Sequence, residues 1–209
     1  MHASAEPRQW FSAVSVAVVD LVAALPGDAV DRQGLGEWSV RELVAHTLRA
    51  WTTVHDYLAE PVPPAGTPVF TAAEYLAQGM AVPGIHEGVA QRARDDAAAL
   101  GDDLAAAARE AAGRAAALVD AEPDDRLLPT RLGVMTLREY LRTRSFELTV
   151  HGLDLARAVA LDPPAALRSA AVPALGLVAE LAGERGDAVA LLEAATGRAP
   201  LPVGYGSLG

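Results

Sequence analysis

The sequence contains no cysteine and no lysine, and aromatic residues make up only 5% of its 209 residues. Without cysteine the chain can form no disulfide, bind no metal through a thiolate and use no cysteine nucleophile. Without lysine, Schiff-base chemistry and a phosphate-binding P-loop are excluded as well. These absences remove several classes of catalytic site before any motif is considered.

Basic charge is also scarce, since 17 arginines stand against 27 acidic residues and give a net charge of −10. This balance argues against a nucleic-acid partner. The first ten residues, MHASAEPRQW, do not place a basic segment before an apolar run, so we expect no signal peptide. No uncharged apolar stretch reaches the roughly 20 residues of a membrane span. We therefore expect a cytoplasmic protein with no membrane partner.

Apolar residues recur with a helical period along most of the chain. The Ser39-Val-Arg-Glu42 and Thr136-Leu-Arg-Glu139 patterns are typical of capping boxes, which begin helices. The predicted helices span residues 6–25, 40–59, 71–80, 85–120, 136–159, 165–181 and 187–196. Residues 123–133 read as a connection or short hairpin, and we find no other strand alternation.

Four long helices with two long connections predict an all-α fold, a four-helix bundle with crossovers and additional short C-terminal helices. We expect the bundle to occupy residues 1–199 and a loop-like tail to occupy residues 200–209. The oligomeric state stays open between a monomer and a homodimer.

The helix over residues 138–159 is unusual because a polar stripe runs through its apolar arc. On a helical wheel the stripe contains Arg144, Glu147, His151 and Asp154. Burying a carboxylate and an imidazole there is costly unless a partner compensates them. Ser145 and Thr149 fall roughly opposite the stripe, where we expect them to face water.

Glu147 and His151 are four residues apart, so their side chains lie one turn apart on one helix face. This spacing suits two ligands of one metal ion, and it equally suits a plain carboxylate–imidazole hydrogen bond. His46 borders the core of another helix. Bundles build metal sites from inward-facing Glu and His on facing helices. Two histidines and one carboxylate would leave coordination positions open, and Zn, Ni, Fe(II) or Mn would fit.

Two further residues of the stripe are candidate catalytic residues. Asp154 can accept the second N–H of His151 and fix its tautomer, or it can simply pair with Arg157. Arg144 can orient Glu147 or hold a substrate carboxylate through two hydrogen bonds, or it can form an ordinary ion pair one turn away. The residues alone leave both choices open.

Two segments resemble the signature helices of the mycothiol-dependent maleylpyruvate isomerase family, which belongs to the DinB-like metalloenzymes. They are GEWSVRELVAHTLRAW at residues 36–51 and TRSFELTVHGLDLARAV at residues 143–159. The resemblance implies a DinB-like bundle that holds a divalent metal, usually zinc, and the family's ligands fall on His46, Glu147 and His151. It also implies mycothiol or a similar thiol as cofactor, with isomerisation of maleylpyruvate to fumarylpyruvate as the founding activity.

The resemblance is partial, because the family's isomerase carries a further C-terminal domain and only a short tail follows Gly197 here. Three hypotheses remain. The protein is a metal- and thiol-dependent isomerase or S-transferase acting on a small electrophile, or it is a non-catalytic bundle that binds a metal or small ligand. The third hypothesis is that Glu147 and His151 form a hydrogen-bonded pair in the core and bind no metal.

Overall fold

The computed structural model describes residues 6–206, and all structural statements concern that part of the chain. Its helices are α1 (Pro7–Ala23), α2 (Val40–Ala59), α3 (Ala72–Met80), α4 (Ile85–Ala99), α5 (Leu104–Ala121), α6 (Leu137–Ala158), α7 (Ala165–Arg185) and α8 (Ala188–Ala195). Its strands are β1 (Gln33–Leu35), β2 (Trp38–Ser39), β3 (Val69–Phe70), β4 (Leu127–Thr130) and β5 (Gly133–Thr136). The expectation of no signal peptide concerns a segment that begins outside the described residues, and the tail is described only as far as residue 206.

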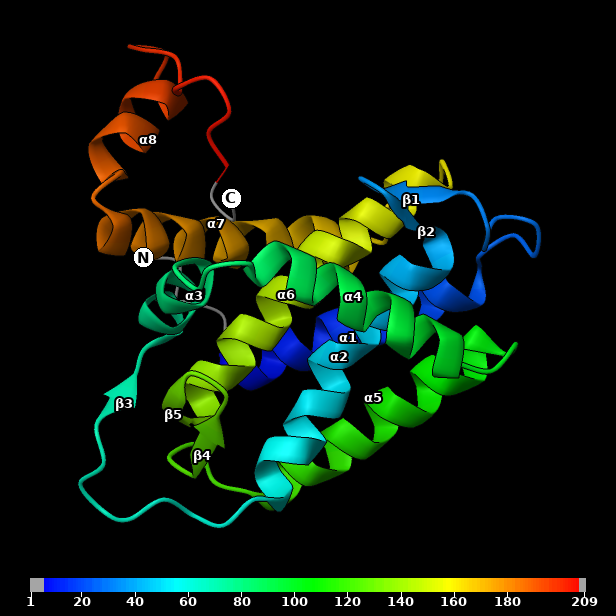
Figure 1. Cartoon of the computed structure of the whole chain (residues 1–209), viewed down its shortest axis with the longest axis horizontal. Helices are drawn as coiled ribbons and strands as arrows, with labels where there is room; N and C mark the ends of the chain where they lie inside the picture. Colours follow the sequence, from blue (N-terminus) through cyan, green and yellow to red (C-terminus); the bar gives the residue numbers. More distant parts are fainter. Residues whose placement is uncertain (1–5, 207–209) are drawn as a thin grey trace.

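Helices α1, α2, α5 and α6 form a four-helix bundle in which each packs against two neighbours (Figure 1). Helix α6 lies between α1 and α2, and α5 closes the other side of the square. The connection from α2 to α5 carries α3 and α4, of which α4 lies along α2. The predicted all-α, DinB-like bundle is therefore confirmed. The division into a bundle over residues 1–199 and a tail stays a proposal.

Ser145 and Thr149, predicted to face water on α6, are instead buried against α1, whereas Arg138 on the same side of the helix is exposed. Ser145 and Thr149 are 0% and 1% exposed. Their hydroxyls donate to the carbonyls of Leu141 and Ser145, one turn back in the same helix. The Trp10 indole N–H also donates to Thr149 Oγ1 at 3.2 Å. A serine or threonine hydroxyl that donates to a carbonyl of its own helix can be buried at a small cost in free energy. A helical wheel alone therefore misplaces such residues.

The capping boxes are confirmed in one case and half confirmed in the other. Ser39 caps α2 through the full reciprocal box with Glu42. Thr136 caps α6 by accepting the Glu139 N–H, but the Glu139 carboxylate does not reach back. It accepts the Ala72 N–H at the start of α3 instead, at 2.9 Å.

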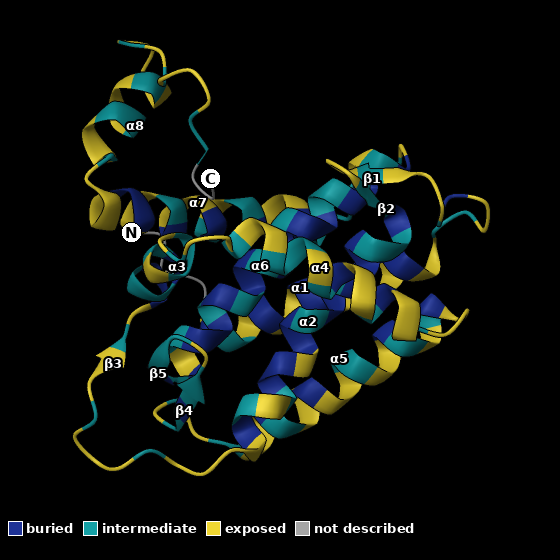
Figure 2. Ribbon diagram, viewed as in Figure 1, coloured by how far each residue is buried: buried dark blue, intermediate teal, exposed yellow. Residues whose placement is uncertain are grey.

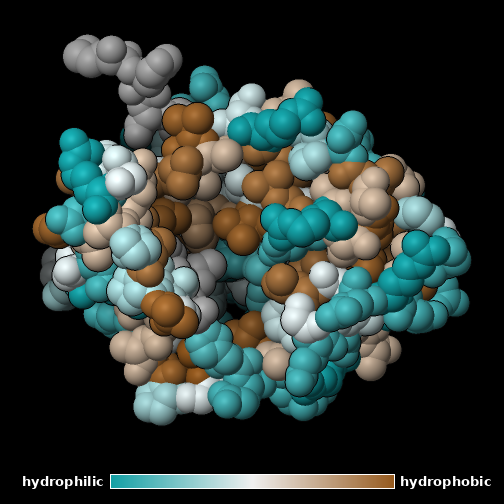
Figure 3. Space-filling view, turned by 90° about the horizontal axis from the view of Figure 1, so that it is seen from above, coloured by the Kyte–Doolittle hydropathy of each residue, from teal (hydrophilic) through white to brown (hydrophobic). Residues whose placement is uncertain are grey.

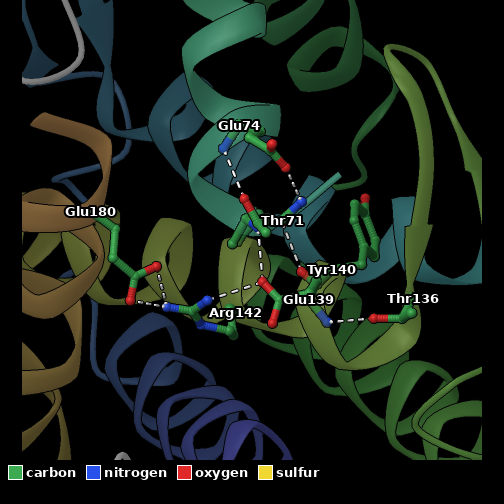
Figure 4. A network of polar contacts seen from close by, with 9 residues as sticks. Thr71, Glu74, Thr136, Glu139, Tyr140, Arg142 and Glu180 are labelled. Atoms are coloured by element: carbon green, nitrogen blue, oxygen red, sulfur yellow. Dashed lines mark hydrogen bonds and ion pairs between the residues drawn. The ribbon is translucent and has the colours of Figure 1, made fainter. Parts of the chain in front are cut away.

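This diversion of Glu139 ties three helices together (Figure 4). Arg142, one turn further along α6, donates to Glu139 and to Glu180 of α7 at 2.9 and 2.6 Å. Thr71 and Glu74 form a capping box at the start of α3 beside them. The network fixes α3 and α7 against α6, and α3 forms part of the wall of the cavity described below.

The single helix predicted over residues 85–120 is wrong. The chain breaks between α4 and α5, where Leu100 adopts an extended conformation. The Asp103 carboxylate then caps the new helix by accepting the Ala106 N–H at 2.8 Å. An aspartate before an alanine run is a normal N-cap, so Gly101 and the acidic pair after it mark a turn.

Short strands also occur where no alternation was seen, although the suspected hairpin is confirmed. Strands β4 and β5 pair in antiparallel fashion from Thr130 and Gly133 outward, and β3 adds to β5 in parallel. Gly133 has a positive φ, and a side chain there would collide with the Phe70 ring. The hairpin turn carries Arg131 toward the cavity described below.

Helices α7 and α8 follow the bundle. The structure extends α7 four residues beyond the predicted end, to Arg185. Among the described helices, α7 is the one that is long and apolar enough to cross a membrane by length and composition. Helix α8 contains no buried residue, and it projects from the body of the molecule (Figures 1 and 2).

Candidate metal centre

His46 from α2 meets Glu147 and His151 from α6 in the interior of the bundle. One ligand atom from each of the three lies within 4.8 Å of the others. The two imidazole rings have centroids 4.8 Å apart and stand edge to face. Because α2 and α6 are direct neighbours in the bundle, residues more than 100 positions apart in sequence share one small volume.

His151 lies between two carboxylates of its own helix. Its Nε2 is 3.2 Å from Glu147 Oε2, and its Nδ1 is 3.3 Å from Asp154 Oδ2. Ionised carboxylates can only accept hydrogen bonds, so both ring nitrogens carry protons when no metal is present. Burial alone would lower the pKa of His151, but the hydrogen bonds to Asp154 and Glu147 raise it to about 9.

The pKa values of Glu147 and His46 are lowered, in contrast to that of His151. Burial would raise the pKa of Glu147, but the hydrogen bond from His151 and the charge of Arg144 lower it to about 2. Burial and the nearby charge of His151 lower the pKa of His46 to about 4. At neutral pH the group therefore consists of an ionised carboxylate, a neutral imidazole and a charged imidazole.

One observation tests whether this group fits a cation. Nδ1 of His46 is buried, and it has no hydrogen-bond partner among the described residues. An unsatisfied buried polar atom costs free energy, and a bound ion is one way to compensate such a group. The Trp38 ring also packs on His46, with the two ring centroids 4.9 Å apart. Two imidazoles and one carboxylate are a donor set for borderline divalent ions, so the residues fit a metal.

The three residues line a cavity of about 560 Å³. Its walls come from α2, α3, α4, α6, the β1–β2 hairpin and the β4–β5 turn, and it is large enough for a small organic ligand. Glu147 and Asp154 are the acidic residues in its lining, and both contact His151. Apart from Thr53, the rest of the lining is apolar, aromatic or basic.

Four arginines from four different elements line the same cavity: Arg49, Arg92, Arg131 and Arg144. Arg49 is paired with Asp96 at 2.9 Å. Arg92 and Arg131 form no ion pair with any described residue. The pKa of Arg92 is lowered by its burial and by the charges of Arg131 and Arg49. Cations that repel one another across a cavity attract an anion into it.

Arg144 is the only member of this cationic wall that the sequence predicted. Its Nε donates to Thr143 Oγ1 at 3.1 Å, and its guanidinium lies 5.0 Å from the Tyr140 ring centroid. No ion pair with Glu147 forms, although the Arg144 charge still acts on that carboxylate. The plain ion pair considered from sequence is therefore absent within the described residues, and the guanidinium is available to a ligand.

Asp154 makes both contacts that the sequence left open. It accepts from His151, and its other oxygen accepts from Arg157 Nη1 at 2.7 Å. The pKa of Asp154 is lowered despite its burial, because His151 and Arg157 both favour its ionised form. The carboxylate is therefore charged and points one oxygen at the imidazole that it orients.

Sequence reasoning missed Trp38, Arg49, Arg92, Arg131 and the tyrosines of the cavity. A signal existed for two residues, since Arg49 follows His46 by one turn and Tyr140 precedes Arg144 by one turn. No local signal existed for Arg92 or Arg131, because only the packing of α4 and the hairpin brings them to the cavity.

The fold and the geometry together define a DinB-like helical bundle with a candidate metal centre between two of its helices. The chain matches the model of the mycothiol maleylpyruvate isomerase N-terminal domain over residues 11–156, and it belongs to that family. The family implies a metal, a thiol partner and a small-molecule substrate. Neither the curated proteins nor the solved structures contain a match to the chain. The family match ends before α7, so α7 and α8 lie outside it.

Proposed function

We propose that His46, Glu147 and His151 bind a divalent metal ion, with zinc the first candidate and Ni, Fe(II) or Mn the alternatives. The proposed protein is a cytoplasmic enzyme that uses mycothiol or a similar thiol on a small electrophile, by cis–trans isomerisation or by S-transfer. The observation that carries this proposal is the convergence of the three side chains beside a cavity, in a chain of this family.

The chemistry assigns distinct tasks to the chain's own residues. When bound, a divalent ion supplies a Lewis acid that favours the thiolate form of a thiol near neutral pH. His46 and Glu147 would hold the ion from two helices, and Asp154 would hold His151 in the tautomer that presents Nε2. Because the chain has no cysteine, the sulfur must come from the cofactor.

The cationic wall supports an electrophile that carries a carboxylate. Arg144 lies one turn from Glu147 on α6, and its unpaired guanidinium suits a bidentate hydrogen bond to a carboxylate. Arg92 and Arg131 come from α4 and the β4–β5 turn, and they add positive charge to the same cavity. A ligand with a reactive double bond near the metal and a carboxylate on this wall would match both sets of groups.

Metal content gives the first test. We expect protein purified without chelator or metal-affinity resin to contain close to one ion per chain by elemental analysis. His151→Ala should bind zinc more than about 100-fold more weakly. Loss of a residue that only hydrogen-bonds to a metal ligand already costs about 10- to 100-fold in affinity, and His151 is itself a proposed ligand. His55→Ala is the matched control, because His55 pairs with Asp56 on α2 outside the cavity. Equal trace metal in wild type and His151→Ala would establish the hydrogen-bonded core pair instead.

Turnover gives the second test. Mycothiol with maleylpyruvate tests isomerisation, and mycothiol with a chromogenic electrophile tests S-transfer. Arg144→Met should lower kcat/KM about 10- to 100-fold for a carboxylate-bearing substrate, the value of a hydrogen bond to a charged group, while metal content stays unchanged. A metal-loaded protein with neither activity would indicate the non-catalytic binding bundle.

A further inference from the structure

Exposed apolar side chains concentrate on α7 and α8. Among residues 6–206, nine large hydrophobic side chains are exposed, and four of them belong to these two helices. They are Val172 and Leu175 on α7, at 69% and 66%, and Val189 and Leu192 on α8, at 69% and 64%. Figure 3 looks at the molecule from the side on which α8 projects, and it shows hydrophobic residues gathered in patches there. Extended exposed apolar surface usually marks an interface.

The bundle already uses the inner face of α7, so the outer face needs another partner. The inner face is formed by the buried residues Leu167, Ala170, Ala174, Leu177 and Leu181. Arg168, Val172, Leu175, Ala179 and Gly183 lie on the outer side and are exposed. We call these five residues the outer face of α7. At helical spacing they form one stripe along the helix.

We propose that the outer face of α7 binds the same face of a second copy of this chain, with the two helices antiparallel. A two-fold axis between Leu175 and Gly176 sets Val172 against Ala179 of the second copy. The same axis sets Arg168 against Gly183, beside Glu184. Two-fold pairing of one surface with itself is the commonest form of homo-oligomer.

Charge selects this arrangement over a parallel one. Arg168 lies in the first turn of α7 and Glu184 in its last turn. Antiparallel pairing brings each arginine near the opposite glutamate and near the negative end of the second helix, which favours cations. Parallel pairing would bring like charges together. No described residue forms an ion pair with Glu184, so its carboxylate is available.

Helix α8 can widen the contact beyond one helix. It begins three residues after the end of α7, so antiparallel pairing places it near the start of the second copy's α7. Val189 and Leu192 can then pack on that copy, which matters because a stable interface needs about 800 Å² from each partner.

A lipid surface is the less suitable partner for this region. Residues 165–196 contain Glu180, Glu184, Asp187 and Glu193 against only two arginines, and the whole chain carries a net charge of −10. Surface-binding helices usually carry basic residues that anionic lipids attract, so the acidic flanks of α7 and α8 oppose such binding.

Analytical ultracentrifugation of the full chain over a wide range of concentration tests the proposal. Wild type should be a dimer, and Val172→Glu should be a monomer with unchanged helical content. Val16→Glu is the matched control, since Val16 is 61% exposed on α1, and it should remain a dimer.

Charge reversal tests the register of the two helices. Arg168→Glu and Glu184→Arg should each weaken the dimer about tenfold, and the double variant should restore it, as expected for residues that interact directly. A monomeric wild type, or a double variant no tighter than the singles, would overturn the proposal. The proposal would also be overturned if the wild type were a monomer that sedimented with phosphatidylserine vesicles and Val172→Glu abolished that binding.

Discussion

Helices α6 and α7 are neighbours of nearly equal length, with 22 and 21 residues, yet they distribute polarity in opposite ways. Helix α6 carries Glu147 and His151 into the interior, whereas α7 leaves Val172 and Leu175 in solvent. Each arrangement costs free energy in the isolated chain. We propose that both departures from the usual pattern mark contact sites, one for a metal ion and one for a second copy of the chain.

The free-energy costs of the buried charges on α6 and of the exposed apolar side chains on α7 are compensated differently. On α6 the buried charges compensate one another, because His151 bonds to Glu147 and Asp154, and Arg157 bonds to Asp154 in turn. On the facing helix α2, His46 Nδ1 is the one buried side-chain polar atom among the described residues that has no hydrogen-bond partner. On α7 no described residue covers the apolar stripe. We propose that a cation completes the first region and that a second copy of the chain completes the second.

The sharpest test of the contrast uses one substitution in both regions. Leu141 on α6 is fully buried and Leu175 on α7 is 66% exposed. Leu141→Ala should lower the free energy of unfolding by about 2–5 kcal/mol, because it leaves a cavity in a packed core. Leu175→Ala should change it by no more than about 0.5 kcal/mol in dilute protein, as for surface positions.

Urea denaturation of both variants checks this prediction, and the change in midpoint at constant slope gives the difference. Repeating the Leu175→Ala measurement at high protein concentration adds the contribution of association. Equal losses for both variants in dilute protein would show that α7 depends on its outer face for folding, and the contrast between the helices would fail.

The next largest effect concerns the residue that orients His151. Asp154→Asn keeps the shape of the side chain but removes the charge that fixes the imidazole. Zinc affinity should fall about 10- to 100-fold, the usual cost of losing such a partner. Arg157→Gln removes the other contact of the same carboxylate, and Arg157 is 73% exposed, so that variant should bind zinc almost as wild type does. Competition with a chromogenic chelator measures the zinc affinity of both variants. Identical affinities would show that Asp154 serves only as the ion-pair partner of Arg157.

The smallest predicted effect, taken over a single pH unit, is the pH dependence of metal affinity. In metal-free protein His151 holds its second proton up to a pKa of about 9, whereas His46 and Glu147 have lost theirs above about 4 and about 2. A metal ion must displace the His151 proton, so affinity should rise about tenfold per pH unit up to about pH 9. Calorimetry at neutral pH in buffers of different ionisation enthalpy should show about one proton released per ion. If metal binding released no proton, His151 would not be held in its charged form by the two carboxylates.

Much of the candidate site was predictable because it is local. Glu147, His151, Asp154 and Arg144 lie within three turns of one helix, where spacing fixes which side chains share a face. His46 followed from a chemical requirement, since two ligands on one helix need a third from a facing helix. The cationic wall was not predictable, because Arg92 and Arg131 reach the cavity through α4 and a hairpin turn whose positions no spacing reveals.

The fold shows the same division. Apolar periodicity and capping patterns determined that the chain is helical, where most helices begin and end, and which helix carries the polar stripe, because these properties depend on neighbours along the chain. Only the tertiary structure decided that Ser145 and Thr149 are buried, that Glu139 bonds to α3 and not to its own cap, and that α7 keeps an apolar face in solvent. Those outcomes depend on which surfaces meet across the bundle, and that is settled by the packing of whole helices.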